Sequence, residues 1–112
     1  MSTKAPATGT PVRISFTAVS VRQARDILDH LTEERLVAGG TIVQAESVNW
    51  VGGELTRTTR KVATAYTTMG KLPFINGRLE TLYGEEAPLL SQFAMAGEKK
   101  SVLGWIERNV RE

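Results

Sequence analysis

The chain has 112 residues, with 14 basic and 12 acidic side chains, one histidine and no cysteine. A domain of this length folds without a disulfide or a metal, and the missing thiols exclude disulfides, iron–sulfur clusters, thiolate zinc sites and cysteine nucleophiles. The net charge of +2 is interspersed rather than clustered, and no apolar run approaches the ~20 residues of a membrane helix. Composition therefore favours a cytoplasmic protein without a nucleic-acid or membrane partner.

The first eleven residues lack the apolar core of a signal peptide. We expect residues 1–11 to form a disordered leader, followed by one domain over residues 12–112. Apolar and polar side chains alternate from Val12 to Val19, which predicts a strand with one buried face.

A helix should follow this strand directly. Ser20 and Gln23 have the spacing of a capping box, in which each side chain satisfies a backbone donor at the helix start. The helix should run from Val21 to about Arg35. It should pack on a sheet through an apolar stripe that consists of Val21, Ala24, Ile27, Leu28 and Leu31.

Two long extended segments come next, over residues 38–51 and 54–68. Gly52 and Gly53 lie between them and supply the positive φ angles of a tight hairpin turn, so the segments should pair antiparallel. Both strands are long for a small domain, and the hairpin tip would project past the helices. Another copy of the chain is the natural cover for it.

The rest of the chain predicts a second helix from Leu72 to Tyr83, a fourth strand over residues 88–95 and a last helix after Gly97. Pro73 fits the first turn of the second helix. The order βαββαβ plus a C-terminal helix is that of a ferredoxin-like α+β fold, with two helices on one face of a four-stranded antiparallel sheet.

Over about residues 12–110 the sequence resembles the CutA divalent-cation tolerance family. The resemblance rests on the order and spacing of Leu36-Val-Ala38, Trp50-Val-Gly-Gly-Glu-Leu55, Thr67-Thr68, Pro88 and Leu103-Gly-Trp-Ile106. It implies a PII-like homotrimer, non-enzymatic, that binds or responds to divalent cations such as copper.

The chain departs from this family at its usual metal donors. Family members typically carry a cysteine where this chain has Gly39, a His-Pro-Tyr where it has about Tyr83-Gly84-Glu85, and a glutamate where it has Leu89. Copper and zinc prefer nitrogen and sulfur donors at fixed spacing. We therefore predict no metal ligands and no cofactor, apart from the divalent cation that the resemblance alone suggests.

The remaining polar clusters have ordinary interpretations. His30 has Asp26 and Glu33 one turn away on its helix, which is common on a solvated surface. Asp26 with Asp29, and Glu85 with Glu86, lack the buried context that would separate their pKa values for acid–base work. Because no nucleophile is paired with a base, the sequence predicts no enzyme.

The best candidate site lies on the returning hairpin strand. Arg57, Arg60 and Lys61 could hold a phosphate or carboxylate, with Trp50 and Tyr66 on neighbouring segments. In a trimer they would line a cleft between subunits. The other interpretation is a polar β-ribbon whose threonines and arginines make cross-strand and inter-subunit hydrogen bonds.

Two other functions therefore stand beside cation tolerance. One is a PII-like sensor that binds a small anion in the inter-subunit cleft. The other is a structural assembly module, which Leu89 and the run Ala94-Met95-Ala96 suggest because they are apolar at normally polar places.

Overall fold

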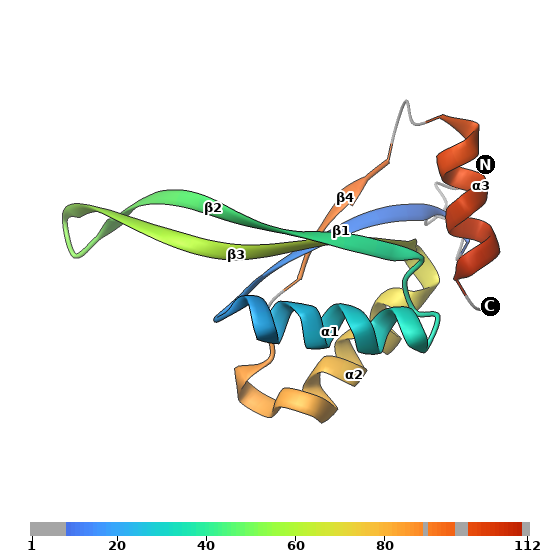
Figure 1. Ribbon diagram of the computed structural model, residues 1–112, viewed down its shortest axis with the longest axis horizontal. Coiled ribbons are helices and arrows are strands. Elements are labelled where there is room, and N and C mark those ends of the chain that lie inside the picture. Colours follow the sequence, from blue (N-terminus) through green and yellow to red (C-terminus); the bar gives the residue numbers. More distant parts are fainter. Residues whose placement is uncertain (1–8, 89, 96–98, 111–112) are drawn as a thin grey trace, which may run out of the picture.

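The computed structural model describes residues 9–88, 90–95 and 99–110 (Figure 1). Residues 1–8 of the expected leader, Leu89 and Ala96 lie outside these ranges. The elements in chain order are β1 (Pro11–Ala18), α1 (Val21–Glu33), β2 (Gly39–Val51), β3 (Glu54–Thr68), η1 (Met69–Lys71), α2 (Leu72–Tyr83), η2 (Gly84–Glu86), β4 (Ser91–Ala94) and α3 (Lys100–Asn109).

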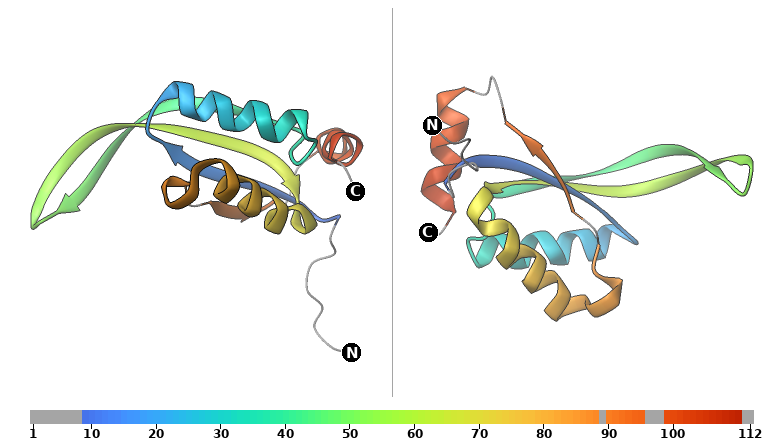
Figure 2. Two further views of the ribbon diagram at one scale, coloured as in Figure 1. Left: turned by 90° about the horizontal axis from the view of Figure 1, so that it is seen from below. Right: turned by 180° about the vertical axis from the view of Figure 1, so that it is seen from behind.

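The four strands form one sheet in the order β2-β3-β1-β4, and every neighbouring pair is antiparallel. Helices α1 and α2 cover one face of this sheet (Figures 1 and 2). Helix α3 packs at one end of the opposite face, where Trp105 meets Tyr66. This confirms the predicted α+β, ferredoxin-like arrangement with a C-terminal helix.

The core lies between the sheet and helices α1 and α2. The predicted inward face of β1 is buried at every position, and so are Ala63 and Ala65 of β3. Alternation along a strand sends successive side chains to opposite faces, so one apolar set per strand suffices. The other large buried side chains come from the helices and the loop after α1: Ile27, Leu28, Leu31, Val37, Ile75 and Leu79.

Helix α1 starts as predicted but ends two residues early. The Gln23 backbone N–H donates to Ser20 Oγ at 3.0 Å, while Gln23 Oε1 accepts from the Val19 N–H at 2.9 Å, one residue before the usual partner. Arg35 ends the helix because it adopts φ +58°. Its N–H donates to Thr32 O at 3.1 Å in a Schellman motif.

The hairpin follows the predicted bounds closely. All thirteen residues of β2 pair with β3, and Gly52 and Gly53 turn the chain at φ +58° and +83°. Strand β1 supports β3 only from Lys61 onward, so the outer half of the hairpin extends alone (Figure 1). Its exposed apolar side chains are Val48, Trp50, Val51 and Leu55.

Two differences from the sequence prediction lie at strand ends. Strand β1 begins at Pro11, and the Met69 N–H donates to Thr10 O at 2.8 Å, so these residues belong to the folded domain. Strand β4 is shorter than residues 88–95, because it pairs with β1 only over Ser91–Ala94.

We predict that Arg35→Gly stabilises the protein by up to about 1 kcal/mol, because a side chain in the left-handed region strains the backbone and glycine does not. Urea unfolding measures the change. Glu33→Gly is the matched control and should destabilise by roughly 1 kcal/mol, since it lies within the helix. A loss of stability in Arg35→Gly would contradict the strain.

We predict that Gly40→Ala destabilises the fold by about 1–3 kcal/mol, the usual cost of overpacking. A Cβ at this position would collide with the Thr64 carbonyl oxygen and would lie 3.1 Å from Leu28 Cδ2. Gly77→Ala is the control, because no heavy atom lies within 4 Å of its Cβ position and alanine favours a helix. Equal thermal midpoints for the two variants would overturn the prediction.

Candidate functional site

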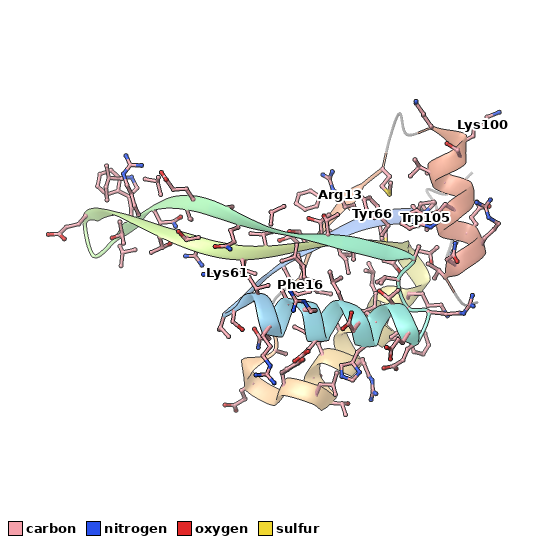
Figure 3. The ribbon with its side chains drawn as sticks, in the orientation of Figure 1. Arg13, Phe16, Lys61, Tyr66, Lys100 and Trp105 are labelled. Atoms are coloured by element: carbon pink, nitrogen blue, oxygen red, sulfur yellow. The ribbon has the colours of Figure 1, made fainter. Side chains whose placement is uncertain are left out.

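The five candidate residues do not meet within one chain. By strand alternation, Arg57 and Lys61 share the face of β3 that carries Ala63 and Ala65, and Arg60 and Tyr66 project from the opposite face. Trp50 lies at the hairpin tip, whereas Tyr66 lies beside α3 at the base; Figure 3 shows Lys61 and Tyr66 well apart. A single site built from all five would require side chains of more than one chain.

The two arginines contact polar groups of the opposite strand. Arg57 Nη1 lies 3.1 Å from Glu46 Oε1, in an ion pair whose partners are both largely exposed. Arg60 Nε donates to Ser47 Oγ at 3.2 Å, and Asn49 Nδ2 donates to the same oxygen at 2.7 Å. The two arginine contacts are the cross-strand contacts of a polar ribbon, whereas the Asn49–Ser47 bond lies within β2. An exposed ion pair adds little stability, so a phosphate or carboxylate can compete with Glu46 for Arg57.

Tyr66 instead belongs to an aromatic contact that the sequence did not reveal. Its ring and that of Trp105 have centroids 5.9 Å apart and planes at 63°, an edge-to-face arrangement (Figure 3). The two residues lie far apart in the chain, so no local spacing could have predicted the pair. Trp105 thereby anchors α3 to the sheet.

The same indole covers the position of the family cysteine. A Cβ at Gly39 would lie 3.2 Å from Trp105 Cζ2, closer than most side-chain contacts. The glycine therefore gives room to the indole, which would have to shift by a few tenths of an ångström to accept a cysteine side chain.

The described residues hold no cluster of three or more histidine, cysteine, aspartate or glutamate side chains that could bind a metal ion. His30, Asp26 and Glu33 are all exposed on α1, as the solvated interpretation predicts. Burial, and then the charge of Asp26, raise the pKa of Tyr83, so this phenol stays protonated at neutral pH.

Two shallow hollows lie elsewhere on the surface. One, of about 290 Å³, lies between α1 and the edge of β2 and includes Arg25, Leu28 and Asp29. The other, of about 440 Å³, lies between the end of α1 and α2 and includes Phe74 and Gly77. Neither includes a candidate residue of the ribbon. Among the helices within the described ranges, none is long and apolar enough to cross a membrane.

A four-stranded antiparallel sheet with two helices on one face and an overlong central hairpin places the chain among the ferredoxin-like α+β proteins. The CutA1 divalent ion tolerance protein family matches residues 12–109. The chain therefore belongs to the CutA1 divalent ion tolerance family, whose members are generally not enzymes. A comparison with curated proteins gives no significant match.

Solved structures agree with this assignment. A divalent cation tolerance protein (Cut A1) from Thermus thermophilus is 25% identical, with a TM-score of 0.77 over 91% of this chain and 100% of that one. The periplasmic divalent cation tolerance protein CutA from Archaeoglobus fulgidus, at 22% identity and the same coverage, also gives 0.77. CutA1 from Oryza sativa shares the fold at 19% identity, with a TM-score of 0.77 over 95% of this chain and 99% of that one.

We predict that Gly39→Cys places its thiol under Trp105, where a thiol reagent labels it slowly. Removing the indole in Gly39→Cys/Trp105→Ala should speed labelling by about tenfold or more, because reactivity depends on access. The chain has no other cysteine, so the signal is specific. Arg22→Cys, on the exposed side of α1, is the fast-labelling control. Equal rates with and without the indole would contradict the packing.

Proposed function

We propose that this CutA1 protein works in the cytoplasm as a homotrimer that contributes to divalent-cation tolerance without a nitrogen–sulfur metal site of the usual kind. The observation that carries the proposal is the length of the β2–β3 hairpin, whose outer half has no cover in a single chain. The absence of cysteine from the whole sequence supports a reducing compartment.

The two sheet edges support assembly into a closed ring. Strand β2 leaves one edge open along thirteen residues, and β4 leaves the other open along Ser91–Ala94. Open edges are templates for pairing with another chain, and a head-to-tail contact between unlike edges closes into a ring when its rotation permits. Trp50 and Leu55, 74% and 62% exposed, would be buried on a neighbour by such pairing.

Cation tolerance need not rest on direct copper or zinc binding in this chain. Gly39 and Trp105 occupy the position where a thiol would lie, and the sequence offers a single histidine. The residues present do not form the donor set that copper or zinc prefers. We propose that the contribution of this protein to tolerance does not depend on copper or zinc held by nitrogen and sulfur donors of this chain.

Light scattering at micromolar concentration should give the mass of three chains of 12.2 kDa, unchanged by added copper. The mass follows from the closure of three chains into a ring. Added copper should not change it, because the chain lacks the nitrogen and sulfur donors that copper prefers. A monomeric mass would overturn the proposed assembly. A copper-dependent mass would show that copper binds the chain, with His30 and its neighbouring carboxylates as the candidate ligands.

A second function is favoured by the charges on the ribbon. Arg57 and Arg60 have only exposed contacts with Glu46 and Ser47, and Lys61 lies one residue further along the strand. Arg57 and Lys61 project from one face of β3 and Arg60 from the other, so a shared cleft would combine Arg57 and Lys61 of one chain with Arg60 of a neighbouring chain that the hairpin crosses. They would then bind a phosphate or carboxylate of a small anion, as in a PII-like sensor.

Isothermal titration with nucleotides and organic acids tests this second function. Binding should weaken by about tenfold in Arg57→Gln or Arg60→Gln, because a charge-assisted hydrogen bond is worth roughly 1.5–3 kcal/mol. Arg22→Gln, on α1, is the matched control and should bind as the parent chain does. The absence of binding heat with every anion would contradict the sensor function.

The third possibility, a structural assembly module, predicts a mass above that of a trimer.

A further inference from the structure

The outward surface of α2 differs from that of α1. Helix α1 exposes arginine, aspartate and glutamate side chains to solvent, as a surface helix of a soluble domain normally does. Helix α2 buries Ile75 and Leu79 but turns Pro73, Phe74, Gly77 and Thr81 outward. Asn76, Glu80 and Leu82 are exposed beside these four residues, but the strip from Pro73 and Phe74 through Gly77 to Thr81 carries no charge of its own. An uncharged strip of this kind marks an interaction site more often than a charged surface does.

We call this surface the α2 face and define it by Leu36, Pro73, Phe74, Gly77 and Thr81, with the flanking Glu34 and Arg78. It combines a projection with a hollow. The Phe74 ring is 62% exposed, and Lys71 Nζ lies 5.3 Å from its centroid. One turn further along, Gly77 has no heavy atom within 4 Å of its Cβ position and lies in the 440 Å³ hollow.

Glycine inside an exposed helix is costly. It destabilises a helix relative to alanine, and the space around Gly77 would accept a methyl group without conflict. No packing contact within the chain therefore requires glycine here. A close approach by a second helix would favour glycine, because it has no side chain to hold the two helices apart.

The charges on the α2 face complement themselves. Arg78 Nε donates to Glu34 Oε2 at 2.9 Å, and both side chains stay more than a third exposed. Each copy thus presents one cation and one anion side by side. A two-fold axis beside this pair would bring each arginine near the partner's glutamate and form a four-charge network with no net charge.

We propose that the α2 face binds the α2 face of a second copy, with the two α2 helices antiparallel about a two-fold axis near Gly77. Each Phe74 ring then enters the hollow over the partner's Gly77, and the two Arg78–Glu34 pairs meet at the flank. A two-fold contact needs a surface that is complementary to itself, and this face combines a projection, a hollow and both charges.

The pairing goes beyond the proposed trimer and does not compete with it. The α2 face lies on the helical layer, on the side of the sheet away from α3, whereas the trimer would use the sheet edges and the hairpin (Figure 2). Pairing therefore joins two complete assemblies. For a single chain the pairing doubles the mass. For a trimer, which carries three such faces, the mass doubles when the two-fold axes are perpendicular to the three-fold axis, so that all three faces meet one partner assembly.

Sedimentation of the full chain from micromolar to millimolar concentration tests the pairing. We expect the mass to double towards the upper end, because a small patch gives a weak contact. The substitution Gly77→Glu places a charged side chain in the hollow and raises the helix propensity of α2. The variant should therefore fold as the parent chain does, but its mass should stay constant over the whole concentration range. A constant mass of the parent chain over the whole range, or doubling of Gly77→Glu, would overturn the proposal.

A charge exchange distinguishes a second copy from a different protein as the occupant. Arg78→Glu and Glu34→Arg each place like charges around the axis and should abolish doubling, with circular dichroism confirming that both fold. The double variant E34R/R78E restores opposite charges and should double again. Failure of the double variant to recover would overturn the two-fold contact. The mass at low concentration reports separately on the proposed trimer.

Discussion

The pairing of β3 with both of its neighbours determines most of this architecture. Strand β3 lies between β2 and β1, and its inner end is held by a side-chain bond, since the buried Thr67 Oγ1 donates to Leu36 O at 2.5 Å. Opposite that end, Gly40 lets Leu28 of α1 approach the sheet. The loop after α1, the start of β2 and the end of β3 thus share one tightly packed corner, from which the hairpin extends outward.

The fold could be predicted from the sequence because its signals are local and agree with one another. Alternation in β1, the Ser20–Gln23 cap and the Gly52–Gly53 turn each determine one element, and the structure confirms all three. The predicted bounds differ from the observed ones only at the ends of helices and strands. Arg35 occupies a helix-terminating position normally held by glycine, so its residue type gave no warning that the helix stops at Glu33.

The candidate site was less accessible to sequence reasoning. Alternation alone places Arg57 and Arg60 on opposite faces of β3, but which face meets another chain depends on contacts outside a single chain. The sequence places Tyr66 on the same strand as the ribbon arginines, whereas in the structure its ring packs against Trp105. A contact between residues so far apart has no periodic signature. The candidate site therefore stays a hypothesis about an assembly.

The locality of the hairpin also bears on the order in which the chain folds. Strands β2 and β3 are joined by two glycines, so they can zip from the turn on the microsecond timescale of hairpins. Strand β1 must find β3 across the whole of α1 and β2, and such distant pairing is slow. Closing the core does not cover Trp50, which is exposed in the finished chain as well, so the tip of the ribbon is uncovered from the time it forms until another chain packs on it. Apolar surface exposed in this way is prone to aggregation while the chain folds and assembles.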